Sequence, residues 1–540
     1  MQSNNNQQDE YGGKTEDRDE HLEQVQTRTL PGSAEMEKGE SVTKVTTGPL
    51  VHDKVSPSKF IIGSQIPLYF FGSILPTIYQ DIGGVDRYVW FVIGSFVPNA
   101  AVCPFVGALS DLFGRQMVAI VGKVFLSVGP IITSTAKTMN IAIAEQVFSG
   151  LGAGLNELIA LAGTGEMVPV RKRAKYVGLV VFSIVPFIPS TLYAQLISKA
   201  SGWRYNGIFV GVWNFIGLVL CIICYHDPPR LHAGYTAKDV LCQVNYVGAA
   251  LSTVGITLFI MGMHAHNVAP FFIGLVFIIA FFVWEIRFAP YPMAPKGLFR
   301  KSKKTMITIL LITFLSGGSY FAMLLFWPTQ TFNVYGYDHV QIGLRALPIG
   351  FGIIGGAVIS LLLIPTTGVR IRGLMIFFTA LMTAGTGAIS VSNPHNRHTM
   401  LGVVTIAGLG VGGVMIPSSI IAQIACPDEF IATVTAITLS LRYIGGAIGF
   451  AAYDNTFYHE FVKHASDVIG VGIIMNGIVA PVAPANIALI GELVALVGNA
   501  QFAELQEVIA TNLLVLRKDA ISIVIVYSQE AFALGYRYPY

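Results

Sequence analysis

The chain has 540 residues, of which 12% are charged and 53% are hydrophobic, and its formal net charge is +3. Soluble domains carry about 25% charged residues, so this composition excludes an ordinary soluble protein, whose surface has to be largely polar. The small net charge and the lack of a basic arm also exclude a nucleic-acid partner, because little positive charge is available to neutralise phosphates.

The N-terminal segment, residues 1–58, differs in composition from the rest of the chain. It is rich in Gln, Asn, Glu, Lys, Gly and Ser. Such a segment cannot bury enough apolar surface to offset the entropy lost on ordering, so we expect a disordered cytosolic tail. Because its first residues are polar rather than apolar, we expect no cleavable signal peptide.

After Lys59 the chain consists of apolar segments of about 20 residues, the length that a helix needs to cross the hydrocarbon core of a bilayer. The sequence therefore predicts an all-α polytopic membrane protein in which the lipid bilayer is the surrounding partner. The predicted helices are 60–80, 89–109, 117–136, 141–165, 174–197, 205–225, 244–262, 269–286, 305–327, 346–365, 373–391, 400–425 and 430–453.

The charged loops indicate how these helices are oriented and grouped. Basic residues concentrate in alternate loops, as in Arg171–Lys175 and Arg300–Lys304, and the positive-inside rule places these loops and the N-terminus in the cytosol. We expect four membrane units after the tail: a six-helix bundle, two linking helices with a basic loop, a C-terminal bundle, and an extracellular or interfacial loop that leads to a truncated last span. Their bounds are 59–226, 227–304, 305–453 and 454–540.

The C-terminal residues are the least regular part of the pattern. Pro481 and Pro484 interrupt the apolar stretch 467–498, and proline breaks a helix because it lacks the N–H group. We interpret this stretch as an outer loop with short helices that lie on the membrane, with a fourteenth span as the alternative. Ile521–Tyr527 and the residues after it are typical of the start of a span, so the last helix is expected to be missing.

Small residues recur at helical spacing within the predicted spans. GxxxG pairs let two helix backbones approach closely in lipid. We therefore predict close helix contacts at four pairs: Gly150/Gly154, Gly352/Gly356, Gly408/Gly412 and Gly445/Gly449.

The loop between the second and third predicted helices carries the most specific motif. It reads G-x-L-x-D-x-x-G-R, matched at Gly107, Leu109, Asp111, Gly114 and Arg115. This loop resembles the corresponding loop of the major facilitator superfamily, although Gln116 stands where that family often has a second basic residue. The resemblance implies that Asp111 faces the positive N-terminal end of the helix that starts near Phe430, and that the loop acts as a conformational latch. A solvated loop with incidental charges is the alternative.

Other stretches resemble the fungal trichothecene efflux pump family, a fourteen-span branch of this superfamily that neighbours the fungal siderophore transporters. The resemblance covers about residues 60–540 and rests on six stretches: Gly150–Leu158, Lys172–Tyr176, Val185–Pro189, Gly202–Tyr205, Tyr291–Phe299 and Leu441–Gly449. Two departures weaken the transfer of a drug-antiporter mechanism. Gln146 replaces an arginine that such antiporters often carry, and Pro186 lacks the glycines that usually accompany it.

A few ionisable residues within the predicted spans are candidates for function, because a charge inside a bilayer is costly. Glu157 lies deep in the fourth helix, and we predict that it carries the coupling proton; a packing carboxylate or an ion pair is the alternative. Arg442 is a candidate for substrate binding or gating, with a structural ion pair as the alternative. Gln146 and Asn156 are further substrate or gating candidates. Glu145 and Glu285 lie near helix ends, where we expect them to reach the interface.

The remaining candidates are structural. We expect Trp203 and Arg204 to anchor the sixth helix at the outer interface. Cys221 and Cys224 form a CxxC within an apolar helix, which favours a buried face over redox or zinc chemistry. We predict no metal site and no cofactor. The sequence contains no G-x-x-x-x-G-K-[ST] motif, which argues against ATP as the energy source.

The sequence thus predicts a secondary active transporter of the plasma membrane, a monomer and not an enzyme. We expect proton-coupled efflux of an amphipathic small molecule, such as a sesquiterpenoid toxin, by alternating access of two helical halves. Uptake of an iron–siderophore chelate is the first alternative. A non-transporting membrane protein from a truncated gene is the second.

Overall fold

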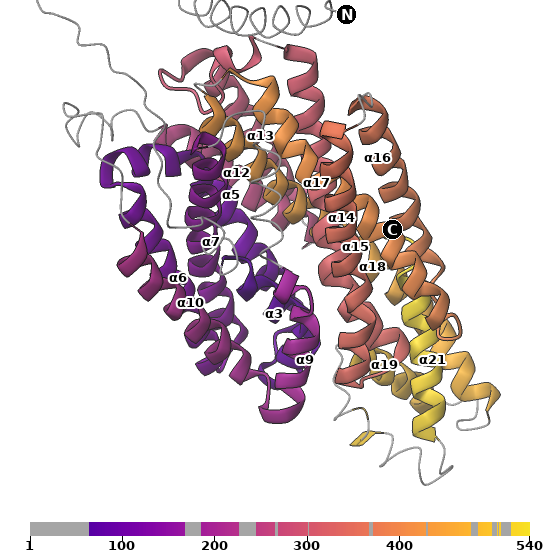
Figure 1. The fold of residues 1–540 in the computed structure, drawn as a ribbon. Coiled ribbons are helices and arrows are strands. Elements are labelled where there is room, and N and C mark those ends of the chain that lie inside the picture. The colour runs from indigo at the N-terminus through magenta and orange to yellow at the C-terminus, as the bar shows by residue number, and fades with distance from the viewer. Residues whose placement is uncertain are drawn as a thin grey trace, which may run out of the picture. The chain divides into compact units, whose positions relative to one another are not determined.

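The computed structural model describes residues 64–167, 185–225, 245–264, 268–300, 302–366, 371–427, 430–476, 484–498, 505, 507–508 and 520–540. Within these ranges the regular structure is entirely helical (Figure 1). Ten of the described helices are long and apolar enough to cross a membrane. The predicted all-α polytopic class is therefore confirmed. The predicted tail, 1–58, lies outside the described residues.

The first part of the chain forms a set of mutually packed helices in which α5, α6 and α7 contact one another and α10 packs on α6. The bounds are α3 Ile66–Ser73, α4 Leu75–Ile82, α5 Tyr88–Phe113, α6 Arg115–Thr135, α7 Met139–Met167, α9 Ser190–Ser201 and α10 Arg204–Cys224, with short 3₁₀ turns at Val85–Arg87 and Val185–Phe187.

The first predicted helix, 60–80, is wrong in one respect. The described part of this segment contains two short helices, α3 and α4, that meet at the non-helical residue Ile74. Pro76 explains the break, because it lacks an N–H group and its ring clashes with the carbonyl four residues earlier. Much of the fifth predicted helix, 174–197, lies outside the described residues. In its described part, α9 begins only at Ser190, after Pro186 and Pro189.

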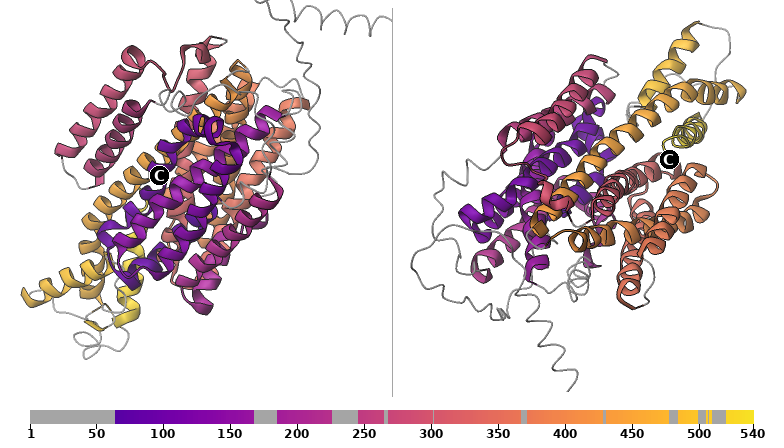
Figure 2. Two further views of the ribbon diagram at one scale, coloured as in Figure 1. Left: turned by 90° about the vertical axis from the view of Figure 1, so that its left-hand side faces the viewer. Right: turned by 90° about the horizontal axis from the view of Figure 1, so that it is seen from above.

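The two linking helices form a pair beside the junction of the two halves. Helix α12, Tyr246–His264, packs on α5 of the first half and α18 of the second, and it also packs along α13, Val268–Val283. The pair is visible in both views of Figure 2. A π-helical segment, Trp284–Phe288, extends α13. The Glu285 carboxylate there accepts hydrogen bonds from the Asn245 side chain and the Ala294 N–H group, each at 2.9 Å.

The second half packs around α17 and α18. Helices α15 and α16 pack on α17, while α14 packs on α17 and α18. The bounds are α14 Lys303–Tyr335, α15 His339–Thr366, α16 Ile371–Ala388, α17 Arg397–Ala425, α18 Ile431–Met475, α19 Pro484–Gly498 and α21 Ala520–Gly535, with 3₁₀ turns at Lys296–Phe299 and Ile389–Val391.

Helix α18 is much longer than the predicted helix 430–453. No proline interrupts the following residues, and an apolar stripe with four-residue spacing continues along one face, as expected for a packed helix. The stripe consists of Phe457, Phe461, Ala465, Ile469 and Ile473, all buried.

Helix α21 runs antiparallel to this C-terminal part of α18. The ring of Phe532 lies 4.5 Å from that of Phe461, and the ring of Tyr536 lies 4.1 Å from that of Phe457. The final residue, Tyr540, reaches Tyr453 at a ring distance of 5.5 Å. The apolar C-terminal segment thus occupies a packed position against the second half.

The four predicted GxxxG pairs lie at close helix contacts, which confirms that expectation. A Cβ atom on Gly356 would collide with the Leu409 backbone of α17, and one on Gly412 would collide with the Ile353 backbone of α15. Gly445 and Gly449 approach the backbone of α14, and Gly150 and Gly154 approach that of α5. Glycine at these positions lets the backbones touch, which gives dispersion contacts and helix association in lipid.

Candidate substrate and proton site

Glu157 lies where three helices from both halves of the chain meet. Helix α7 places its side chain inside the protein, with 8% of its surface exposed. The Oε2 atom accepts a hydrogen bond from the Tyr443 hydroxyl of α18 at 2.6 Å and one from the Gln65 amide at the start of α3 at 2.5 Å. Gln65 also donates to the Tyr443 oxygen. One carboxylate oxygen therefore links α3 and α7 to α18.

Aromatic rings surround this polar contact. Tyr443 stacks on Phe321 of α14 at a ring distance of 5.3 Å and approaches Phe96 of α5 at 6.0 Å. The hydroxyl groups of Tyr69 and Tyr320 lie 2.6 Å apart and form a second bond between the halves. A carboxylate, hydroxyl groups and aromatic faces at one place suit a ligand with both apolar and polar parts.

Arg442 adjoins the site but points toward α17. One of its terminal nitrogens donates to the Met415 carbonyl at 3.1 Å and to the Ser419 hydroxyl at 2.8 Å. Its Nε atom is buried without a hydrogen-bond partner among the described residues. These hydrogen bonds make Arg442 a link between α18 and α17, and the unsatisfied Nε is a donor that a ligand could engage. Its substrate or gating role stays a prediction.

Gln146 and Asn156 lie in different surroundings. Gln146 lines a small polar cavity together with Gln65 and Tyr443, and its amide donates to the Glu145 carboxylate at 3.1 Å. Asn156 donates to the Gly152 carbonyl of its own helix at 2.9 Å and lies against Gly122 of α6. The structure thus brings Gln146 toward the Glu157 cluster and places Asn156 between α6 and α7.

The position of Glu145 differs from the one predicted from the sequence. We expected it to reach the interface, but it is 1% exposed and accepts hydrogen bonds from Thr133 of α6 and from Ser149. The reason is that α6 and α7 pack closely here through Gly129, which leaves the carboxylate facing the neighbouring helix rather than the lipid.

Several residues of the site were missed from the sequence. The residues that were not predicted are Gln65, Tyr69, Tyr320 and Tyr443. Tyr443 does lie within Leu441–Gly449, one of the stretches that resemble the efflux pump family. An amide in an apolar first span was an available signal for Gln65. The tyrosines carried no such signal, since aromatic residues occur throughout the spans.

The predicted latch loop is almost entirely helical, because α5 continues to Phe113 and only Gly114 separates it from α6. Gly114 has φ 88° and joins the two helices without a spacer; positive φ favours glycine because it has no Cβ. Leu109 packs with an apolar cluster that includes Ala436 and Leu439 near the start of α18. The loop region thus adjoins the helix that the latch hypothesis requires. Gly107 has open space around it. Arg115 begins α6, and the side chain of Asp111 lies outside the described part.

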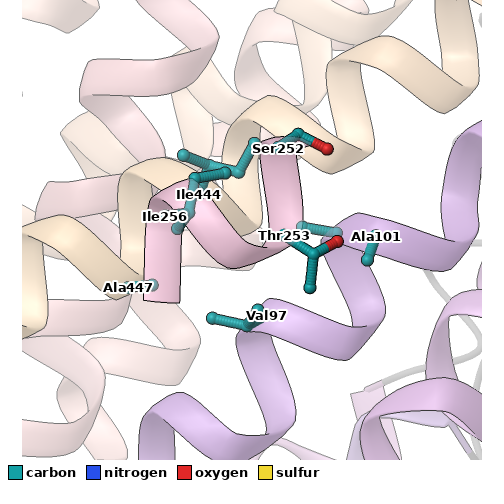
Figure 3. A pocket seen from close by; sticks show the side chains of 8 residues that line it. Val97, Ala101, Ser252, Thr253, Ile256, Ile444 and Ala447 are labelled. Atoms are coloured by element: carbon teal, nitrogen blue, oxygen red, sulfur yellow. The ribbon is translucent and has the colours of Figure 1, made fainter. Parts of the chain in front are cut away.

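A second small cavity lies where linking helix α12 crosses α5 and α18. Val97 and Ala101 of α5, Ser252, Thr253 and Ile256 of α12, and Ile444 and Ala447 of α18 line it (Figure 3). Its lining is mostly apolar, and the two hydroxyl groups come from α12. Helix α12 therefore covers the contact between α5 and α18 at this level.

Trp203 and Arg204 connect α10 to the end of α4. Trp203 is buried, with 4% of its surface exposed, and its Nε1–H group donates to the Asp81 carboxylate at 2.9 Å. Arg204 forms an ion pair with the same carboxylate and also donates to the Ala136 carbonyl. The contacts are with protein, and the role as an interface anchor stays a prediction.

Replacing Asp81 with alanine should destabilise the protein more than replacing it with asparagine. Alanine leaves the buried Trp203 N–H group without its acceptor, at a cost of about 1 kcal/mol after discounting for the exposure of Asp81, whereas asparagine keeps an acceptor. Thermal unfolding of the detergent-solubilised variants measures this difference. Equal losses would contradict the assigned role of the Trp203 bond.

The same contact predicts a pH dependence. Burial opposes ionisation of Asp81, but the hydrogen bonds from Trp203 and Arg204 and the charge of Arg204 outweigh it and lower the pKa of the carboxyl. Its contribution is therefore present above the ordinary pKa of about 3.9 and is lost as the pH falls through the lower folded value. The effect of the alanine substitution should be constant between neutral and mildly acidic pH. A change in its size across that window would contradict the assignment.

Comparison with known proteins decides the family. A family model of the Major Facilitator Superfamily matches residues 61–450. The chain belongs to this superfamily. It is 25% identical over 436 residues to the trichothecene efflux pump TRI12 of Fusarium sporotrichioides, covering 76% of this chain and 72% of that protein. It is 24% identical over 408 residues to multidrug resistance protein 3 of Bacillus subtilis, covering 72% and 76%.

Solved structures show the same fold. A bacterial homologue of the human lysosomal transporter Spinster, in an inward-facing and occupied conformation, aligns with a TM-score of 0.54 at 12% identity, covering 88% of this chain and 96% of that one. The human organic anion transporter MFSD10 aligns with a TM-score of 0.51 at 13% identity, covering 74% and 93%. This member of the Major Facilitator Superfamily is a multi-pass membrane protein and a secondary transporter, and its ligands are small molecules.

Proposed function

We propose that the protein uses the proton gradient to export an amphipathic small molecule across the plasma membrane, with its N-terminus in the cytosol. The observation that carries this proposal is the single Glu157 carboxylate that accepts bonds from both halves of the chain. The names of efflux relatives support the direction of transport, and the aromatic surroundings support an amphipathic ligand.

The proposed coupling follows from the chemistry of this contact. An ionised carboxylate makes stronger, charge-assisted hydrogen bonds than a neutral carboxyl group. The deprotonated form of Glu157 therefore holds α3 and α7 against α18, and protonation weakens the bonds between the halves. A proton bound from the outside would favour separation of the halves and release of the exported molecule, and its loss to the cytosol would reset the site.

The test uses sealed inside-out plasma-membrane vesicles that contain the protein. Uptake of a labelled trichothecene and of a labelled ferric siderophore is followed with and without an imposed pH gradient. Accumulation of the trichothecene that depends on the gradient is the expected result. Siderophore movement alone would replace export with iron handling, and no movement of either by the inserted protein would contradict the proposed substrate class.

The loop motif gives a further prediction about conformational balance. We expect Asp111→Asn to weaken the closed inner mouth, because it removes a negative charge proposed to face the positive N-terminal end of α18. In the variant, a cysteine placed on the inner side would become more reactive toward a membrane-impermeant maleimide. A cysteine placed on the outer side would become less reactive. Glu285→Gln, a carboxylate change away from this loop, is the control. Unchanged labelling in Asp111→Asn would contradict the latch.

A further inference from the structure

A line of polar groups extends along α7 from Glu145 to Glu157. Glu145, Ser149, Ala153 and Glu157 are spaced four residues apart, so each lies about one turn further along the helix and about 40° further around it, and the row spans about 18 Å. The Ser149 hydroxyl donates to the Glu145 carboxylate. Tyr443 donates to Glu157 at 2.6 Å. Each of the two carboxyl groups thus accepts a hydrogen bond from a neighbouring hydroxyl group.

One small cavity is lined by both of the residues that supply these hydroxyl groups. Ser149 and Tyr443 both line it, and so do Gln65 and Gln146, while Ala153 contributes a small side chain between them. The cavity is about large enough to hold one water molecule. Its lining includes Gln65, Asn99 and Gln146, whose amide groups supply hydrogen-bond partners for a buried water.

We propose that Glu145 and Glu157 are the two ends of a proton path along α7, connected by Ser149, a water in this cavity and Tyr443. The inference rests on the proposed proton coupling and adds a second proton-binding residue to it. Glu145 lies nearer the Met139 end of α7, which is the outer end in the proposed topology, so it is the entry point for protons from outside.

The transfer balances at each step. Protonation of Glu145 reverses its bond with Ser149, so that the carboxylic acid donates to the Ser149 oxygen and the Ser149 hydroxyl turns to donate to the water. Glu145 then gives its proton to the Ser149 oxygen, and Ser149 passes its own proton to the water. The water passes a proton to the Tyr443 oxygen, and Tyr443 passes its own to the Glu157 Oε2 atom. One O–H bond forms for each one that breaks, and the net result is one proton lost by Glu145 and one gained by Glu157.

The surroundings of the two carboxyl groups differ in a way that suits these roles. Neutral groups act on Glu145: Thr133 from α6, and Gln146 and Ser149 from its own helix. It can therefore take up or release a proton without breaking an ion pair. The groups around Glu157 come from four helices and include one cation: Gln65 and Tyr69 of α3, Cys103 of α5, Tyr320 of α14, and Arg442 and Tyr443 of α18. Arg442 favours the ionised form of Glu157, which is the state that accepts the proton and the state to which the residue returns after releasing it.

The transport test compares two kinds of movement in proteoliposomes that contain the full chain and a labelled trichothecene. Transport driven by a pH gradient requires net proton movement, whereas exchange of labelled for unlabelled compound does not. We expect Glu145→Gln and Ser149→Ala to reduce driven transport by about tenfold or more and to leave exchange nearly unchanged. The control is Ser360→Ala, which removes another buried hydroxyl group, one that bonds to its own helix.

Three outcomes would overturn the path. Driven transport could survive in Glu145→Gln, or driven transport and exchange could fall together, which would indicate a structural role. The third outcome concerns infrared titration of the purified protein, which needs no substrate. We expect one titrating carboxylic-acid band that Glu145→Gln removes and another that Glu157→Gln removes. If Glu145→Gln removes no such band, the path is wrong. If the wild type moves no trichothecene, the proposed substrate fails, and the infrared result decides the path by itself.

Discussion

Replacing Glu157 with glutamine should reduce transport driven by a pH gradient by about two orders of magnitude, because the amide keeps the size of the side chain but cannot bind and release a proton. Exchange of labelled for unlabelled compound should continue. Measurement of both activities in proteoliposomes checks the prediction. Tyr443→Phe should lower driven transport less, since it removes the 2.6 Å bond to Glu157 but leaves the carboxyl group.

Glu285→Gln is the matched control for this experiment. Glu285 also accepts two hydrogen bonds, but from Asn245 and the Ala294 backbone near the linking helices. The Glu285→Gln variant should therefore transport like the wild type. Unchanged driven transport in Glu157→Gln would show that another group carries the coupling proton, and the assignment of Glu157 would then be wrong.

The second large effect is expected at the contact between α15 and α17. A Cβ atom on Gly356 would collide with the Leu409 backbone, which no side-chain rotation can relieve. Gly356→Val should therefore force the two helices apart and destabilise the protein by about 1–3 kcal/mol, the usual range for overpacking. A lower thermal unfolding midpoint and a lower yield of folded protein in detergent are the measurements.

Gly355→Val is the control because it lies on the same helix and next in sequence. A Cβ atom at Gly355 meets no other atom within 4 Å. The two variants therefore carry the same change in helix propensity and hydrophobicity, and they differ only in what the new side chain meets. Equal stability of the two variants would contradict the close backbone contact.

The helical architecture follows from local features of the sequence. The apolar segments define the spans because a helix satisfies its own backbone hydrogen bonds in lipid. Gly352/Gly356 and Gly408/Gly412 were predicted as contact points, and the structure pairs these two motifs with each other. The predicted helix bounds were wrong in two kinds of place. A proline broke a predicted helix, as at Pro76, and an apolar stripe continued beyond the length needed to cross a bilayer, as in α18.

The geometry of the site depends on contacts between residues that are far apart in the sequence, and no pattern of neighbouring residues predicts such contacts. Glu157 could be identified from the sequence because a charge in an apolar span is conspicuous and costly. Its donors, Gln65 and Tyr443, are separated from it by 92 and 286 residues, so only the packing of α3, α7 and α18 brings them together. Glu145 was misplaced for the same reason, since the burial of a residue near a helix end depends on its neighbour.

The sequence by itself determined the membrane-spanning helical class, the tight turn at Gly114 and the candidate carboxylate in the fourth helix, because each follows from composition or from residues close together along the chain. The tertiary structure decided which side chains share a hydrogen bond, that Arg442 bonds to α17, and that a cavity lies between Ser149 and Tyr443. Those features depend on how helices from distant parts of the chain pack, and helix packing is set by many weak contacts whose partners are fixed only in the folded protein.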